Sequence, residues 1–287
     1  MDNPDLKKTL DELYVTYHMD YLSSDPLELV REYKDPRDQE LVGFIAALLA
    51  LGRADLIKNA VRSILERMGG SPHRFIRSFD PSKDGEVFNG FVYRFYRGWN
   101  VGLLVWWLKQ ILQGEGSIKA FFLRRYGESD ENIGPSLSRF VRAILKLETE
   151  SFYPFLPRRG SGVRHWLADP SDGSGCKRLN LFLRWMVRCD GLDLGLWPEV
   201  SSSQLVIPLD THIARIGRRI GLTKRASPDW KMALEITESL KKFDPQDPVK
   251  YDFALCRVGM LNGCPVKPNP VVCSSCPLFL FCENSFH

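Results

Sequence analysis

Hydrophobic positions along most of the chain recur with the 3.6-residue period of an α-helix. Segment 40–52, ELVGFIAALLALG, is apolar on every face, which predicts a buried helix that ends at Gly52. Segments 101–112 and 136–148 repeat the helical period. The alternation typical of strands is scarce, and we find no internal repeat. The pattern therefore predicts a mostly α fold.

Helix start signals divide the rest of the chain. Asp25-Pro26 is a typical cap and first helical residue, and Asp210, two residues after Pro208, stands at the N-cap position of a helix that begins at 211. Residues 153–175 are rich in proline and glycine and predict a long loop into a basic helix at 176–188. A second irregular stretch covers 189–205.

Composition is that of a globular protein, with 44% hydrophobic and 26% charged residues. The longest apolar stretch, 41–52, is too short to span a bilayer, and the N-terminal segment lacks the apolar core of a signal peptide. We therefore expect a cytoplasmic protein that does not bind membranes, and a monomer by default.

The net charge of +4 is modest, but its distribution is uneven. Basic residues dominate from Arg158 to Arg188, and a second basic group follows at Arg215, Arg218, Arg219, Lys224 and Arg225. These stretches either form one surface that binds nucleic acid or are solvated helix faces.

Four of the seven cysteines lie within nineteen residues, as C-x8-C-x2-C-x5-C. They are Cys264, Cys273, Cys276 and Cys282. Disulfides are not expected in the cytoplasm, and a C-x2-C pair with two flanking thiolates suits a metal centre. Spacing alone does not separate a 4Fe–4S cluster from zinc. We expect the other cysteines, 176, 189 and 256, to be small buried side chains or bystanders.

Two further groups carry possible chemistry. Gly173, Ser174 and Gly175 precede a helix whose first turn holds Lys177, and glycines there let backbone amides approach a phosphate. Asp210 is an N-cap, and capping alone is the commoner role of an aspartate at such a site.

Together these residues resemble the helix-hairpin-helix superfamily of DNA glycosylases, and especially its endonuclease III branch. That branch has a G-V-G-R-K hairpin, a V-D-T-H segment and a C-x6-C-x2-C-x5-C loop, in this order. The corresponding segments here are 173–177 (GSGCK), 209–212 (LDTH) and 264–282. The resemblance covers roughly residues 39–66 and 171–287, and the chain looks like a distinct bacterial branch of the superfamily.

The resemblance implies a mostly α, two-domain fold of the helix-hairpin-helix DNA glycosylase type with a C-terminal 4Fe–4S cluster loop. Residues 25–200 would form a domain like a six-helix barrel, with the hairpin near 171–188. Residues 1–24 and 201–287 would form the domain that carries the cluster loop 264–282. DNA would bind across the junction between the domains.

The resemblance also implies a function, base-excision repair on double-stranded DNA with a damaged base or an abasic site, in a nucleoid-associated bacterial enzyme. Lys177 would be the nucleophile that forms an imine at the sugar C1′, and Asp210 would assist it. The base would have to leave the helical stack. The residues expected to contact DNA are Gly173, Ser174, Gly175, Arg53, Arg178, Arg215 and Lys267.

The chain departs from the branch in three places. The branch often has a glutamine, which fills the space left by the flipped base, where this chain has Gly52, so either Arg53 fills that space or the DNA is opened differently. The hairpin entry reads PSDGSG and lacks the apolar-Pro-Gly-Val sequence usual in the branch. Thirty-two residues separate Lys177 from Asp210, more than in the branch, and the inserted 189–205 segment would line the base pocket or block it.

Two other functions remain open on the residues alone. One is a nucleic-acid-binding iron–sulfur protein without catalysis, in which Lys177 only contacts phosphate. The other is a structural module stabilised by zinc.

Overall fold

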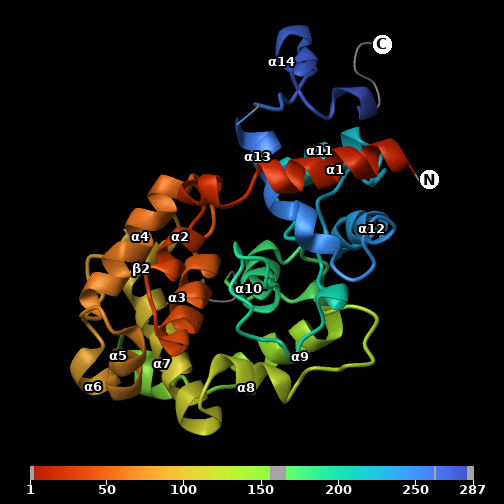
Figure 1. The fold of residues 1–287 in the computed structure, drawn as a ribbon. Coiled ribbons are helices and arrows are strands. Elements are labelled where there is room, and N and C mark those ends of the chain that lie inside the picture. The colour runs from red at the N-terminus through yellow and green to blue at the C-terminus, as the bar shows by residue number, and fades with distance from the viewer. Residues whose placement is uncertain (1–2, 156–165, 262, 283–287) are drawn as a thin grey trace. The chain divides into compact units, whose positions relative to one another are not determined.

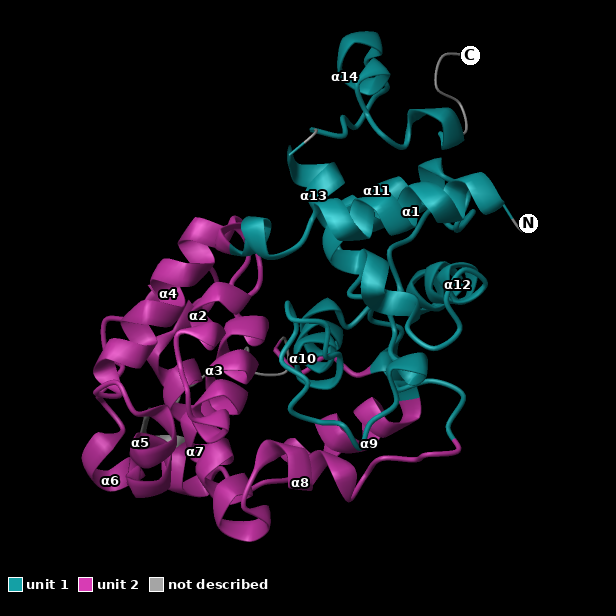
Figure 2. Cartoon of the chain, viewed as in Figure 1, with its two compact units in different colours: residues 1–22, 130–134, 170–287 teal, residues 23–129, 135–169 magenta. Residues whose placement is uncertain are grey.

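The computed structural model of the chain describes residues 3–155, 166–261 and 263–282. It is mostly helical, as the hydrophobic pattern predicts, with one short two-stranded sheet among the described residues (Figure 1). The chain forms two compact units (Figure 2). Unit 1 contains residues 1–22, 130–134 and 170–287, and unit 2 contains residues 23–129 and 135–169.

Unit 2 is built mainly of helices. Its elements are α2 (Leu27–Arg31), α3 (Pro36–Leu48), α4 (Ala54–Arg67), α5 (Pro72–Ser78), α6 (Pro81–Asp84), β1 (Val92–Tyr93), β2 (Tyr96–Arg97), α7 (Gly98–Glu115), α8 (Ile118–Leu123), α9 (Gly134–Ile144, of which the first residue belongs to unit 1) and the 3-10 helix η2 (Glu150–Phe155).

The core of unit 2 contains α3 and α7, which are buried along most of their length. Helix α3 begins after Asp35, whose carboxylate accepts from the amide of Arg37, and it ends at Leu48. The expected end at Gly52 is therefore wrong by four residues, because the backbone turns before Gly52, which has a φ of +115°. The buried carboxylate of Glu40 on α3 accepts from the amides of Ile118 and Lys119, at 2.8 Å each, and so caps α8.

Unit 1 combines the N-terminal helix with the C-terminal part of the chain. Its elements are α1 (Pro4–Thr16), the start of η1 (Met19–Ser24), η4 (Pro170–Asp172), α10 (Lys177–Val187), η5 (Ser202–Gln204), α11 (Thr211–Arg219), α12 (Trp230–Lys241), η6 (Pro248–Tyr251), α13 (Asp252–Leu261), α14 (Pro270–Ser274) and η7 (Phe279–Phe281). Helix α13 packs against both α1 and α11.

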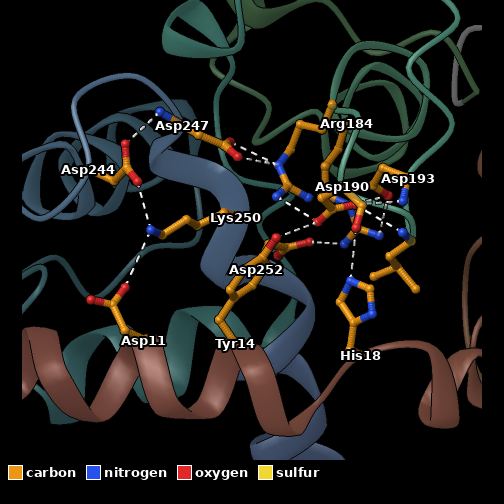
Figure 3. Close-up of polar contacts among 12 residues, drawn as sticks. Asp11, Tyr14, His18, Arg184, Asp190, Asp193, Asp244, Asp247, Lys250 and Asp252 are labelled. Carbon is orange, nitrogen blue, oxygen red and sulfur yellow. Dashed lines mark hydrogen bonds and ion pairs between the residues drawn. The ribbon is translucent and has the colours of Figure 1, made fainter.

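A buried network of charged side chains lies at the end of α10 (Figure 3). Arg184 pairs with Asp252 on α13 (Nη1 to Oδ2, 2.5 Å) and with Asp193 (Nη2 to Oδ1, 3.2 Å). Arg188 pairs with Asp193 as well, and with Asp247 and Asp190 at 2.9 Å each. Both guanidinium groups are almost completely buried, so each carboxylate compensates a charge that water does not reach.

The same network holds the N-terminal helix. The Tyr14 hydroxyl on α1 donates to Asp190 at 2.9 Å, and burial raises the pKa of Tyr14 to about 12, so it remains a donor at neutral pH. Asp11 on α1 accepts from the Tyr251 hydroxyl at 2.8 Å. Asp11 also pairs with Lys250 at 3.3 Å (Figure 3). These contacts explain why α1 belongs to unit 1.

The compact units differ from the expected domains mainly in residues 170–200, and also in residues 23–24 and 130–134. Residues 1–22 join the C-terminal part of the chain, close to the expected grouping of 1–24 with 201–287. Residues 170–200, however, lie in unit 1, whereas the expected division put them with 25–169. The reason is physical: Arg184 and Arg188 pair with carboxylates of the C-terminal part. Within the described part of the chain, no helix is both long and apolar enough to cross a membrane.

We predict that Arg188→Ala lowers the free energy of unfolding by about 3–5 kcal/mol, because it leaves buried carboxylates without their counter-charge. Arg62→Ala is the matched control, since Arg62 forms an exposed pair with Glu32 at 3.3 Å and should cost less than about 1 kcal/mol. Urea unfolding followed by circular dichroism measures both. Equal losses in the two variants would contradict a stabilising role for the buried network.

Candidate active site around Lys177 and Asp210

The structure brings together the lysine and the aspartate that the sequence singles out. Lys177 is the first residue of α10, and Asp210 is the N-cap of α11. Lys177 Nζ lies 3.9 Å from Asp210 Oδ2. The two side chains are 31% and 16% exposed, so solvent reaches the amine more readily than the carboxylate. This distance is at the outer limit of an ion pair and too long for a direct hydrogen bond.

The two oxygens of Asp210 have different partners. Oδ1 accepts from the amides of His212 and Ile213, at 2.8 and 2.9 Å, and so caps α11 as the sequence predicts. Oδ2 points to Lys177 and also accepts from the Cys256 thiol at 3.7 Å. The cap therefore fixes the carboxylate in the orientation that presents Oδ2 to the amine.

Cys256 is a neighbour of this site that the sequence analysis missed. It lies on α13, four residues after Asp252, and so shares the helix face of the buried network. Burial of the sulfur, together with the charge of Asp210, raises the pKa of the thiol, which therefore stays protonated and donates to the carboxylate. The one signal in the sequence is the four-residue spacing, which places Cys256 and Asp252 on the same face of a helix. This spacing does not show that Cys256 contacts Asp210.

Asp252 connects the site with the buried network. Burial raises the pKa of Asp252 to about 6, the paired Arg184 opposes this shift, and the nearby charge of Asp210 adds to it. The close approach of α11 and α13 depends on Gly259, because a Cβ atom there would lie 2.8 Å from Cβ of His212. Helix α13 thus packs against α11, the helix that Asp210 caps, and contacts Asp210 through Cys256.

The expected hairpin residues form the turn before α10. Gly173 has a φ of +81°, and its carbonyl accepts from the amide of Trp230 at 2.9 Å, while Ser174 pairs with Asp229 in an isolated bridge. Gly175 packs against Leu209, to which a Cβ atom at Gly175 would come within 3.3 Å. The turn is therefore fixed to the starts of α11 and α12.

The remaining residues expected to contact DNA are spread over both units. Arg178 and the half-buried Arg215, whose Nη2 lies 3.2 Å from His212 Nδ1, are near the site in unit 1. Lys267 is exposed on the cysteine loop. Arg53 lies in unit 2, where it is exposed and pairs with Asp55 at 2.8 Å. DNA contact remains a prediction for all seven residues, and Arg158, where the first basic stretch starts, lies outside the described residues.

The cysteine loop is joined to α11 by Arg219. Its guanidinium donates to Cys264 Sγ at 3.2 Å and to the carbonyls of Pro265 and Val266 at 2.7 and 3.1 Å. Arg219 therefore holds the loop, rather than extending the basic surface that the charge pattern suggested. An N–H donor to a cysteine sulfur is the kind of outer-shell contact that tunes a metal–thiolate centre.

The four cysteines of the loop are all half-buried. Burial raises the pKa of the Cys276 thiol, and it raises that of Cys282 to about 11; the charges of Cys264 and Cys273 add to both shifts. Among the described residues, no three histidine, cysteine or acidic side chains are arranged as a metal site. Four cysteine thiols are the right kind and number of ligands for a metal–thiolate centre. In the described residues they are not gathered around one point.

The other cysteines are not part of this loop. Cys176 is buried at the start of α10, as expected, and Cys189 is exposed. Cys256 is the exception to the expectation of a bystander, because of its contact with Asp210.

The sequence profile of one protein family, described as "Protein of unknown function (DUF2400)", matches residues 25–261, and the chain belongs to this family. The matched region includes Lys177 and Asp210 and ends three residues before Cys264. Neither a curated protein nor a solved structure matches the chain.

We predict that Asp210→Ala lowers the free energy of unfolding by about 1 kcal/mol, because the amides of His212 and Ile213 lose their acceptor. Asp210→Asn should cost much less, since asparagine is an equally good cap. Thermal or urea unfolding compares the two variants. If asparagine destabilises as much as alanine, the charge rather than the cap holds Asp210 in place. Otherwise Asp210→Asn separates the chemistry of the carboxylate from its structural role.

Proposed function

We propose that the chain is a DNA repair glycosylase with abasic-site lyase activity, in which Lys177 is the nucleophile and Asp210 assists it. The observation that carries the proposal is the orientation of Asp210: the helix cap holds Oδ1, and Oδ2 faces the Lys177 amine at 3.9 Å. The cap thus uses one oxygen of Asp210, and the other oxygen is the one that faces the amine. The resemblance to helix-hairpin-helix glycosylases supports the same assignment.

The proposed chemistry begins at the amine. An amine attacks only in its uncharged form, and Oδ2 of Asp210 is placed to accept the proton that Lys177 must release. The Nζ–C1′ bond forms as the bond from C1′ to the base breaks, and the base leaves with the bonding electron pair. The carboxylate stabilises the positive charge that develops on the sugar.

The lyase step would follow from the covalent intermediate. The C1′–O4′ bond then breaks with its electron pair on O4′, which takes up a proton released from Nζ. The nitrogen lone pair forms the C1′=Nζ double bond of a protonated imine. Loss of a proton from C2′ then allows the 3′ phosphate to leave with its bonding pair, which breaks the strand. At an abasic site the same imine forms by condensation of the amine with the C1′ aldehyde and loss of water.

We further propose that the cysteine loop holds a 4Fe–4S cluster with a structural role, bound by Cys264, Cys273, Cys276 and Cys282. The four thiols on one loop and the Arg219 contact to Cys264 support this proposal. The cluster would shape the loop that presents Lys267 to the DNA backbone. Zinc is the alternative metal for the same four donors.

We predict that borohydride traps the wild-type protein covalently on a duplex with one abasic site, because hydride reduces an imine between protein and sugar to a stable amine. Lys177→Ala should abolish the adduct, since without that imine hydride reduces only the free sugar aldehyde. Lys242→Ala, at an exposed lysine of the same unit, should trap normally. Asp210→Asn should slow trapping, whereas Asp229→Asn, at the cap of α12, should not. Gel electrophoresis of the reduced mixtures measures the adduct.

The same experiment distinguishes the binding-only alternative. If Lys177 merely contacts phosphate, no variant traps, and Lys177→Ala weakens DNA binding while it lowers the slope of log affinity against log salt by about one. That outcome would contradict catalysis by Lys177.

We predict about four iron atoms and as many sulfides per chain in protein purified without oxygen, with the brown absorption of an iron–sulfur cluster. Cys273→Ser should lower the iron content, because serine removes one thiolate ligand. Cys189→Ser is the matched control, since Cys189 is exposed and lies outside the loop. Metal analysis that finds zinc in place of iron would contradict the cluster.

A further inference from the structure

The strands β1 and β2 form a short hairpin in unit 2. Val92 pairs with Arg97 and Tyr93 with Tyr96, so the turn consists of Arg94 and Phe95 alone. Arg94 has a φ of +50°, which a tight two-residue turn of this kind requires. Two apolar side chains of the hairpin are exposed: Phe95 in the turn is 73% exposed, and Val92 in β1 is 63% exposed.

The base of the hairpin is firmly held. Tyr93 and Tyr96 are buried, and the Tyr93 hydroxyl donates to the carbonyl of Leu51 at 2.7 Å. Arg97 stiffens the turn, because its Nη1 donates to the carbonyls of Arg94 and Tyr96 at 2.8 and 3.0 Å. The hairpin therefore presents Phe95 on a fixed support, so an occupant gains its contact at little cost in ordering the protein.

The sequence around the hairpin contains basic but no acidic residues. No acidic residue occurs between Glu86 and Glu115, a segment that contains Arg94, Arg97 and Lys109. Within the described part of the chain, no carboxylate pairs with the guanidinium of Arg94 or Arg97. An exposed aromatic ring flanked by unneutralised arginines matches a nucleic-acid strand, whose bases stack on the ring and whose phosphates meet the cations.

Arg94 also covers Gly52. A Cβ atom at Gly52 would lie 2.2 Å from Arg94 Nη2, and the φ of +115° at Gly52 disfavours any other residue. The side chain that occupies the space beside Gly52 is therefore that of Arg94, from the hairpin.

We propose that the hairpin apex is the DNA wedge of this protein. Phe95 would insert into the base stack at a damaged or abasic site, and Arg94 would contact a phosphate beside it. The proposal rests on the proposed function for its substrate, DNA opened at a lesion, and it assigns the wedge to the hairpin in place of Arg53. It involves no covalent step.

Binding to a duplex with one tetrahydrofuran abasic analogue, followed by fluorescence anisotropy over a range of salt concentrations, tests the wedge. Because this analogue has no aldehyde, Lys177 forms no imine with it. Phe95→Ala should weaken binding about tenfold without changing the salt slope, because a lost stacking contact involves no counterions. Phe95→Trp should bind as the wild type does, and Arg94→Gln should lower the salt slope by about one.

Val15→Ala is the control, since Val15 is 76% exposed on α1, outside the hairpin, and should bind normally. Wild-type binding by Phe95→Ala would overturn the wedge, as would an equal loss in Phe95→Ala and Phe95→Trp. A different result tests the proposed function. Trapping that does not depend on Lys177 would contradict the lysine nucleophile, and a tenfold loss of binding in Phe95→Ala would still support the wedge. Conversely, Lys177-dependent trapping with a neutral Phe95→Ala would remove only the wedge.

Discussion

The arrangement of unit 1 depends on two arginines that would be very unfavourable inside a protein without their partners. Arg184 and Arg188 lie one turn apart at the end of α10, and both are buried. Their carboxylate partners come from the turn after α10, from the segment before α13 and from α13 itself. A buried guanidinium loses so much hydration that its partners must be in place in the folded chain. The network therefore fixes α10 against α13, and through Asp190 it also fixes α1.

The candidate site follows from that constraint. Helix α10 has the arginines at one end and Lys177 at the other, while α13 carries both Asp252 and Cys256. Once α10 and α13 are fixed together, Lys177 and the Cys256 thiol approach Asp210 Oδ2, and the cap of α11 orients that oxygen. The same carboxylate therefore caps α11 and faces the Lys177 amine. Unit 2 carries a different feature, the short β1–β2 hairpin with the exposed ring of Phe95.

Local features of the sequence predicted local features of the structure. The cap at Asp210, a buried helix over much of the expected segment 40–52 and the helical character of most of the chain all depend on residues close together in the sequence. The pairing of Lys177 with Asp210 came from the family resemblance rather than from the pattern. Contacts between distant residues were not predictable: Arg184 meets Asp252 across 68 positions, and Arg94 covers Gly52 across 42. The role of Arg219 at Cys264, 45 residues away, was missed for the same reason.

The central claim is that one particular amine, Lys177 Nζ, forms the bond to the sugar. The most direct test is to digest the borohydride-reduced protein–DNA adduct with protease and nuclease and to locate the sugar remnant by tandem mass spectrometry. The account predicts that the remnant is on Lys177, in the peptide that begins α10. A remnant on another lysine or on the N-terminal amine would contradict it, because the account assigns the bond to the amine that lies 3.9 Å from Asp210 Oδ2.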